Sequence, residues 1–318
     1  MQLETENRTM TEMQESVERI GLPEFLPGLL REQYGEQTAV RIIQGYGAKR
    51  KVTLRANTIK ATAEEIDKAL SEAGISYSKV PWYEDAFVIE EGDESRIRQL
   101  AVYEEGKIYL QSLSSMLPPL ALGPRAGADI LDMAAAPGGK TTQMAAMTGN
   151  KAHITACEMN SIRMERLRYN VEKQGASCVY LMQKDSRTLD DFFSFDQILL
   201  DAPCSGSGVL DLEDARLQTH FTRKLIDKSV KAQTALIKKA VNLLKKGQEM
   251  VYSTCSVLAC ENEMIVKSAL SGGKVELVPL SAEAFPGLPV LPVKLAGTLC
   301  VAPDELYEGF FLAKLRKR

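Results

Sequence analysis

The sequence predicts an α/β protein whose mostly parallel β-sheet is covered by helices on both faces and is preceded by a smaller α+β unit. From residue 129 onward, short apolar segments rich in β-branched residues alternate with segments of helical periodicity, which is typical of buried parallel strands. A long helix is expected over about 222–246, with Lys245 and Lys246 in its last turn and Gly247 beyond it. The expected strands are ADILDM, HITACE, CVYLMQ, DQILLD and GQEMVYS, at 128–133, 153–158, 178–183, 196–201 and 247–253.

Residues 1–110 are predicted to form the smaller, N-terminal unit, and residues 111–318 the sheet domain. Apolar residues three and four apart favour helices over about 10–47. Strand-like segments then alternate with a helix at 61–74, and the strand-like segments are KVTLRAN, ISYSKV, FVIE and KIYLQ. Pro118 and Pro119, with the GPRAGA segment, are expected to interrupt regular structure between the two regions.

Composition excludes several classes of protein. No apolar stretch reaches the roughly 18 residues of a membrane span, and the polar N-terminus MQLETENRTMTEMQE lacks the apolar core of a signal peptide. The six scattered cysteines indicate reduced thiols, so we expect a cytoplasmic protein without a disulfide framework. Two histidines and no Cys-x-x-Cys pair give no basis for a metal site.

The net charge of −3 does not by itself indicate a nucleic-acid partner. Binding to phosphates depends on local positive charge, and most basic clusters are solvated faces. The clusters here are Lys49-Arg50-Lys51 with Arg55, Arg223-Lys224 with Lys228 and Lys231, and Arg316-Lys317-Arg318.

A glycine turn follows the first strand of the sheet domain, in DMAAAPGGKTT at 132–142. Glycines at a strand-to-helix turn let the backbone approach a ligand, and the helix N-terminus offers free N–H groups. A phosphate-binding P-loop is the poorer interpretation, because it requires glycine where Ala134 stands and Pro137 removes a donor. Tight packing alone also explains such a turn.

Carboxylates follow the next three strands. Glu158 ends the second strand, 19 residues after Gly139, where an acidic residue can bind a ribose diol. Asp185 and Asp201 follow the third and fourth strands. A single carboxylate at such a place can be a helix N-cap. Three at successive strand ends predict a nucleoside-binding edge, because ligands of open α/β sheets bind there.

Two thiols follow neighbouring strands, Cys204 in DAPCSGSG and Cys255 in YSTCS. Adjacent strands would bring both into one cleft. Thiolates are strong nucleophiles, and Asp201 would stabilise charge on a heterocyclic substrate. A redox pair is the alternative, although exchange centres usually have closer spacing. Cys157 and Cys178, within strands, are expected to be structural.

The chain resembles the RNA cytosine-C5 methyltransferases of the Fmu/Sun type, from about residue 50 to the C-terminus. The motifs that carry this resemblance are LRANTIK, EEGKIYLQSLSS, DMAAAPGGKTT, DAPCSGSG, YSTCSVLACENE and EGFFLAKLRK. The resemblance implies a Rossmann-like fold, S-adenosylmethionine as methyl donor and methylation of cytosine carbon 5 in RNA.

The resemblance also implies roles for individual residues. Cys255 is the implied nucleophile, Cys204 assists product release, and Lys140 and Asp201 lie near the target base. The implied S-adenosylmethionine-binding residues are Ala134, Ala135, Ala136, Pro137, Gly138, Gly139, Lys140, Glu158, Arg163, Asp185 and Asp201.

The chain departs from the family pattern at two places. Ala134 replaces a usual cysteine, without expected consequence, and VLDLEDARLQ at 209–218 replaces an Arg-Asn-Pro segment of the substrate-facing loop. No RNA-binding domain follows GFFLAKLRKR, so we expect the N-terminal unit to bind RNA.

Ribosomal RNA is the first expected substrate and transfer RNA the alternative, with the protein acting as a monomer. A methyltransferase for exocyclic amines is disfavoured, because those enzymes carry Asn or Asp before Pro-Pro-aromatic and need no thiol pair. A non-catalytic RNA-binding assembly protein remains the rival from a different class.

Overall fold

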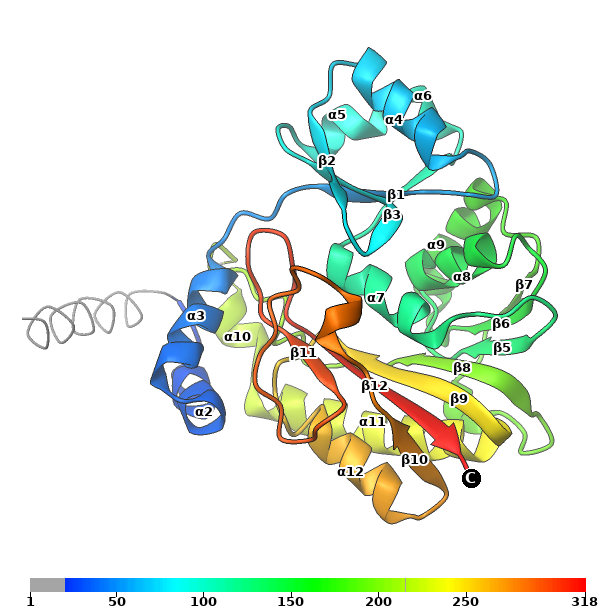
Figure 1. The fold of residues 1–318 in the computed structure, drawn as a ribbon. Helices are drawn as coiled ribbons and strands as arrows, with labels where there is room; N and C mark the ends of the chain where they lie inside the picture. The colour runs from blue at the N-terminus through cyan, green and yellow to red at the C-terminus, as the bar shows by residue number, and fades with distance from the viewer. Residues whose placement is uncertain (1–20, 215) are drawn as a thin grey trace, which may run out of the picture.

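The computed structural model of the protein describes residues 21–214 and 216–318 (Figure 1). Two helices come first, α2 (Phe25–Tyr34) and α3 (Glu36–Tyr46). The part of the predicted helical region before residue 21 lies outside the described residues. Buried side chains such as Leu26, Leu30 and Ile42 place both helices in the hydrophobic core of the large sheet.

A small antiparallel sheet follows, drawn in cyan at the top of Figure 1. Its strand order is β2-β3-β1-β4, and its own core contains Leu54, Ile66 and Phe87. Thr62 and Glu65 form a capping box that starts α4. The elements of this unit are β1 (Thr53–Ala56), α4 (Ala63–Glu72), β2 (Tyr77–Val80), β3 (Tyr83–Ile89), α5 (Glu94–Arg98), α6 (Ala101–Glu104) and β4 (Ile108–Leu110). The predicted boundary at residue 110 coincides with the end of β4 and stays a prediction.

The large sheet contains eight strands, in the order β10-β12-β9-β8-β5-β6-β7, with β11 beside β12. The strands from β7 to β9 are parallel, and β12 is antiparallel to its neighbours. The strands are β5 (Asp129–Asp132), β6 (His153–Cys157), β7 (Val179–Met182), β8 (Phe195–Asp201), β9 (Leu244–Thr254), β10 (Val275–Val278), β11 (Leu299–Val301) and β12 (Phe310–Lys317). The predicted fold class, a Rossmann-like sheet with a small N-terminal α+β domain, is confirmed.

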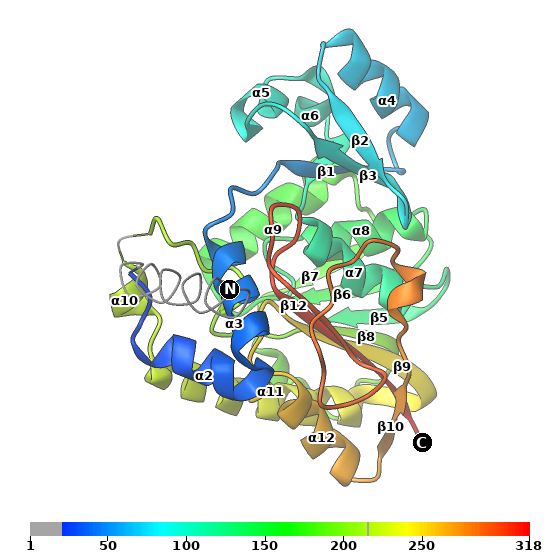
Figure 2. The ribbon, with the colours of Figure 1, turned by 60° about the vertical axis from the view of Figure 1, so that its left-hand side comes forward.

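Helices cover both faces of this sheet (Figures 1 and 2). One face carries α7 (Leu113–Leu122), α8 (Gly139–Met147) and α9 (Ser161–Gln174), and the other carries α11 (Arg223–Leu243) and α12 (Glu263–Ser271). The short elements η1 (Ser186–Thr188), α10 (Leu217–His220) and η2 (Ala282–Ala284) complete the fold. In the part of the chain that the structure describes, no helix is both long and apolar enough to cross a membrane.

The expected interruption at Pro118 and Pro119 is wrong, because both prolines lie inside α7. Prolines remove backbone donors, so helical carbonyls one turn earlier lose their partners. Gln111 Nε2 donates to the carbonyl of Ser115 at 3.0 Å and so replaces the bond that Pro119 cannot make. A side-chain donor from outside the helix thus allows α7 to continue.

The expected end of the long helix is also wrong. Helix α11 stops at Leu243, and Leu244 begins β9 by pairing with Phe195 of β8. Lys245 lies on this strand and forms ion pairs with Asp129 and Asp196 instead of facing helical carbonyls. Pairing with β8 therefore takes over directly where the helix ends.

Candidate active site

A cavity of about 390 Å³ opens at the carboxyl ends of β5 and β8. The chain order reverses at β5, since β6 and β7 lie on one side and β8 and β9 on the other. Such a reversal is where open α/β sheets bind their ligands. The cavity is lined by Tyr109, Leu110, Gln111, Ser112, Ser115, Asp132, Ala134, Ala135, Ala136, Pro137, Gly139, Lys140, Asp201, Val209, Cys255, Glu308 and Phe310.

The loop from Ala134 to Lys140 forms one wall of this cavity through all of its residues except Gly138. Gly138 has φ +112°, a conformation that L side chains rarely adopt, and a Cβ there would lie 3.0 Å from Leu167 Cδ1. Gly138 is also the N-cap residue of α8, and no side chain caps that helix. The first N–H groups of α8 are therefore available to a ligand.

Asp132, the last residue of β5, lies beneath this loop. Its side chain is buried, and Thr141 Oγ1 donates to Oδ2 at 2.7 Å. The other oxygen, Oδ1, is buried with no hydrogen-bond partner among the described residues. Burial, reinforced by the nearby charge of Asp201, raises the pKa of Asp132 to about 6. The cavity thus contains an acceptor that a polar or cationic ligand could use.

Lys140 and Asp201 form an ion pair in the cavity wall. Lys140 Nζ lies 2.7 Å from Asp201 Oδ2 and donates to Ser115 Oγ, also at 2.7 Å. Ser253 Oγ donates to Asp201 Oδ1 at 2.8 Å. Burial alone would lower the pKa of Lys140, but the charge and hydrogen bond of Asp201 raise it above its ordinary value. Lys140 is therefore a cation at neutral pH, and Asp201 is fixed by two donors.

The two predicted thiols lie side by side. Strands β8 and β9 are parallel neighbours with Asp201 opposite Ser253, and the loops that follow bring Cys204 Sγ within 2.8 Å of Cys255 Sγ. Both cysteines are free, and only Cys255 lines the cavity. The hydrogen bond with Cys255, together with burial, raises the pKa of Cys204 well above its ordinary value. Cys204 is therefore protonated beside the sulfur that faces the cavity, and either sulfur could be the donor in their contact.

The structure places Glu158, Arg163 and Asp185 outside the cavity lining. Glu158 is buried and accepts from the N–H of Asn160 at 2.8 Å. Arg163 connects Glu158 to the loop, because Nη1 lies 3.4 Å from Glu158 and Nη2 donates to the carbonyl of Ala136 at 2.7 Å. Asp185 caps η1 and binds the Arg187 guanidinium, which lowers the pKa of Asp185.

Several lining residues were not among the sequence-predicted site residues. Ser115 holds Lys140 Nζ, and the Lys140 ammonium lies 5.5 Å from the ring centroid of Phe310. Asp132 was not predicted as a site residue, although it lies at a strand end like the three carboxylates that were predicted to bind the cofactor. Tyr109, Gln111 and Glu308 come from the IYLQ and EGFF segments, which were recognised as motifs but given no role.

Arginines of two of the three basic clusters are engaged within the fold, whereas Lys49 of the first cluster is exposed. Arg55 is fully buried, and its guanidinium donates to Gln111 Oε1 and Thr142 Oγ1 at 2.8 and 2.7 Å. Arg316 and Arg318 form ion pairs with Glu249 and Glu276. These arginines therefore contribute to packing and pairing within the fold.

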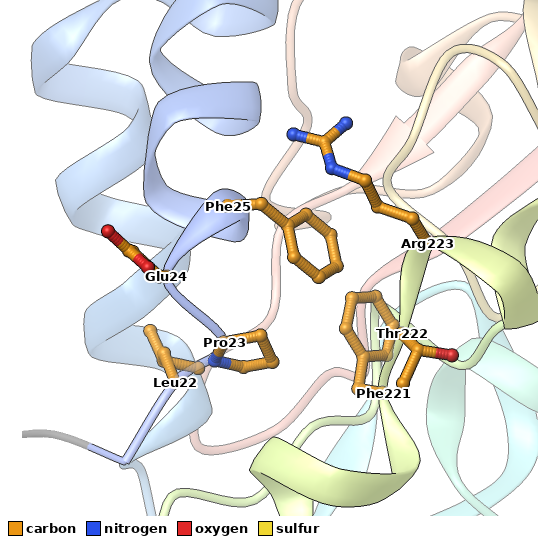
Figure 3. A pocket seen from close by; sticks show the side chains of 7 residues that line it. All are labelled: Leu22, Pro23, Glu24, Phe25, Phe221, Thr222 and Arg223. Atoms are coloured by element: carbon orange, nitrogen blue, oxygen red, sulfur yellow. The ribbon is translucent and has the colours of Figure 1, made fainter.

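A second cavity, of about 410 Å³, lies between the start of α2 and the start of α11 (Figure 3). The Phe25 and Phe221 rings stack at 6.0 Å, and the Arg223 guanidinium lies 4.7 Å from the centroid of Phe25. None of the predicted site residues lines it. Among residues 21–214 and 216–318, no group of three or more His, Cys, Asp or Glu side chains could hold a metal ion.

Residues 119–316 match the family model described as 16S rRNA methyltransferase RsmB/F. The chain belongs to this family. Residues 22–94 match the ferredoxin-like domain of RsmF/B-like methyltransferases. The resemblance to Fmu/Sun-type enzymes drawn from the sequence motifs is thus confirmed.

Curated relatives of this family include proteins named ribosomal RNA small subunit methyltransferase F. Those from Shewanella loihica and Serratia proteamaculans are each 38% identical, over 275 and 274 residues. Each alignment covers 83% of this chain and 56% of the relative. The chain thus spans little more than half the length of these relatives.

Solved structures of similar proteins cover nearly the whole chain. A methyltransferase homolog from Pyrococcus horikoshii is 33% identical with a TM-score of 0.84, and the match covers 96% of this chain and 99% of that one. NSun6 from the same organism, solved with SFG, an S-adenosylmethionine analogue, is 25% identical with a TM-score of 0.83 and coverage of 94% and 99%.

Proposed function

We propose that the chain transfers a methyl group from S-adenosylmethionine to carbon 5 of a cytosine in RNA, with Cys255 as the nucleophile. The observation that carries this proposal is the pair of sulfurs 2.8 Å apart at the edge of a cavity that also contains the Lys140–Asp201 ion pair. Membership of the RsmB/F family supports it.

The residues around the cavity fit S-adenosylmethionine. The volume of about 390 Å³ lies within the range of small-molecule sites, roughly 300–1,000 Å³. The unpartnered Oδ1 of Asp132 offers an acceptor, and the uncapped start of α8 offers N–H donors. Together they suit a ligand that carries positively and negatively charged groups. We assign the loop Ala134–Lys140 and Asp201 to the amino-acid part of this cofactor, and Glu158, Arg163 and Asp185 to its nucleoside part.

S-adenosylmethionine supplies a methyl group bound to a positively charged sulfur, and the carbon of this methyl group is an electrophile. Cytosine carbon 5 is too weak a nucleophile to take this methyl directly. Cys255, as a thiolate, adds to carbon 6, and the electrons of the 5,6 double bond then form the new bond from carbon 5 to the methyl carbon, while the bond from that carbon to the donor sulfur breaks and its electron pair stays on the sulfur. The addition places negative charge on the ring, and Asp201, fixed by Lys140 and Ser253, can pass a proton from the Lys140 ammonium to a ring nitrogen and so neutralise this charge.

Product release requires loss of the carbon-5 proton to a base and departure of Cys255 as a thiolate. We assign Cys204 to this stage. Because the pKa of Cys204 is raised, its S–H stays protonated and can donate a hydrogen bond to the departing sulfur 2.8 Å away. This stabilises the leaving group.

We assign small-subunit ribosomal RNA as the substrate, because the relatives named above carry that substrate in their names. Transfer RNA is the alternative. The loop at 209–218 contributes Val209 to the cavity lining, so its departure from the family pattern falls where the choice of RNA would be made.

Methyl transfer to RNA tests the proposal directly. Purified protein is incubated with labelled S-adenosylmethionine and small-subunit ribosomal RNA, and bisulfite mapping of cellular RNA with and without the protein locates the cytosine. We expect the wild-type protein to incorporate labelled methyl groups into the RNA, and we expect Cys255→Ser to abolish this incorporation. A Cys255→Ser variant that retains its function in cells would favour the non-catalytic RNA-binding role.

A further inference from the structure

A buried carboxylate, Glu261, lies between the two loops that carry the thiols. Glu261 is fully buried in the turn before α12, and the resemblance gave it no role. Its backbone carbonyl accepts from the hydroxyl of Tyr252 at 2.6 Å, which fixes the turn against β9. The turn that carries this side chain is therefore held in place.

Each carboxylate oxygen of Glu261 accepts from a residue adjacent to a cysteine. Oε1 accepts from the N–H of Ser205 at 2.7 Å, and Oε2 accepts from the hydroxyls of Ser205 and Ser256 at 2.5 and 2.7 Å. Ser205 directly follows Cys204, and Ser256 directly follows Cys255. One carboxylate thus connects the two thiol loops.

Helix α11 supplies a further donor to this arrangement. Gln233, fully buried on α11, donates to Glu261 Oε1 at 3.2 Å and to the carbonyl of Pro203 at 3.1 Å. Pro203 directly precedes Cys204. The backbone on both sides of Cys204 is therefore tied to Glu261, through Ser205 on one side and Gln233 on the other.

The hydroxyl of Ser256 is committed to Glu261. Its oxygen accepts from the N–H of Leu258 at 3.1 Å and lies 2.7 Å from Ser207 Oγ, which itself accepts from the N–H of Val257. Ser207 therefore donates to Ser256, whose single proton goes to Glu261. A donor in place of Glu261 Oε2 would find the Ser256 oxygen already occupied.

No Lys or Arg of the described chain forms an ion pair with Glu261. Its negative charge is therefore not neutralised by a neighbouring cation and affects the nearby thiol of Cys204. Among the causes that raise the pKa of Cys204, after the hydrogen bond with Cys255 and burial, is the charge of Glu261. A buried carboxylate of this kind is stabilised by its four donors.

We propose that Glu261 is a positioning residue that sets the distance between Cys204 and Cys255 by binding Ser205 and Ser256. This inference rests on the proposed function, because the distance matters only if both sulfurs act on one base. Chemical steps between positioned groups lose rate steeply when the groups move by about 1 Å.

Glu261→Gln is the direct test, and Glu263→Gln is the matched control. Glu263 is also buried and only two residues away, but it accepts from the N–H of Lys294 and contacts neither thiol loop. The readout is the rate at which methylated small-subunit ribosomal RNA is released from its covalent complex with the protein, because release is the stage assigned to Cys204. We expect Glu261→Gln to lower this rate about tenfold or more, and Glu263→Gln to leave it unchanged.

Two further measurements separate positioning from general stability. Glu261 does not line the cofactor cavity, so S-adenosylmethionine affinity measured by calorimetry should be unchanged in Glu261→Gln. Alkylation of Cys204 by iodoacetamide should become possible at lower pH, because a negative charge has been removed. If Glu261→Gln fails to fold, Ser256→Ala removes the hydroxyl that connects the Cys255 loop to Glu261 and should show the same slowing.

The outcomes distinguish this inference from the proposed function. A wild-type protein that forms neither an adduct nor methylated RNA contradicts the proposed function. A wild-type protein that reacts, with Glu261→Gln and Ser256→Ala releasing product at the same rate, overturns the positioning role alone. Equal losses of release rate and cofactor affinity would also overturn it, because they indicate a general structural effect.

Discussion

Lys140 Nζ lies 2.7 Å from Asp201 Oδ2, which joins the start of α8 to the end of β8 across the cavity. Ser115 Oγ on α7 also accepts a hydrogen bond from Lys140 Nζ. The pair thereby connects the cofactor loop, the sheet and the helix that follows the small domain. A single ion pair at the reversal point of the sheet can position both a methyl donor and a base.

Breaking this pair should reduce catalysis more than it reduces stability. Asp201→Asn leaves Lys140 a buried cation with a weaker acceptor and removes the carboxyl group that can pass a proton to the base. We expect kcat to fall about 100-fold, the scale of losing one group that transfers a proton. Steady-state methyl-transfer assays measure this, with Asp196→Asn at the opposite end of β8 as the control. Equal kcat values for Asp201→Asn and wild type would remove Asp201 from the chemistry.

Asp132 should make stability depend on pH. Its pKa is about 6 in the fold and 3.8 in the unfolded chain, so the folded state binds the proton more tightly. Asp132 therefore contributes to the free energy of unfolding an amount that is fully present below pH 3.8 and is lost as the pH rises to about 6. The loss should approach about 3 kcal/mol.

Asp132→Asn isolates this contribution from other titrating groups. Urea unfolding of both proteins between pH 4 and 7 should show the wild type losing stability relative to Asp132→Asn as pH rises. A difference that stays constant over this range would contradict the raised pKa.

Cys204→Ala should trap the enzyme on its product. The variant retains Cys255 but lacks the S–H beside the departing sulfur, so protein covalently joined to RNA should accumulate on denaturing gels. Cys260→Ala is the control, because Cys260 lies in the turn before α12 and does not line the cavity. Normal turnover by Cys204→Ala would contradict the release role.

Gly138→Ala should weaken cofactor binding beyond its effect on stability. The φ of +112° strains any L side chain, at a cost of about 1–2 kcal/mol. Gly149→Ala is the matched control, since φ is +56° there and no atom lies within 4 Å of a Cβ. Calorimetry should show weaker S-adenosylmethionine binding only for Gly138→Ala. Equal affinities in the two variants would mean that this turn does not hold the cofactor.

The sequence predicted the features that depend on local patterns. The five strands of the parallel region and their order along the chain followed from apolar segments spaced by helices. Cys204 and Cys255 were assigned to one cleft because loops after adjacent parallel strands meet at the same sheet edge.

Features that depend on contacts between distant segments were not predicted. Arg55 was counted with an exposed basic cluster, yet it is buried. Gln111, which directly follows β4, and Thr142 on α8 accept hydrogen bonds from its guanidinium. Pro119 was expected to interrupt structure, but the side chain of Gln111 replaces the hydrogen bond that Pro119 cannot make to the carbonyl of Ser115. The partner of Glu261 in each thiol loop likewise becomes visible only in three dimensions.

The identity of the residue that attacks the base is tested most directly by mass spectrometry of the trapped complex. Protein is incubated with S-adenosylmethionine and RNA containing 5-fluorocytidine, digested, and the modified peptide sequenced. We expect the nucleotide on Cys255, with a methyl group already on carbon 5. A nucleotide on Cys204, or methylation of ordinary RNA with no adduct at either sulfur, would contradict the role of Cys255 as nucleophile.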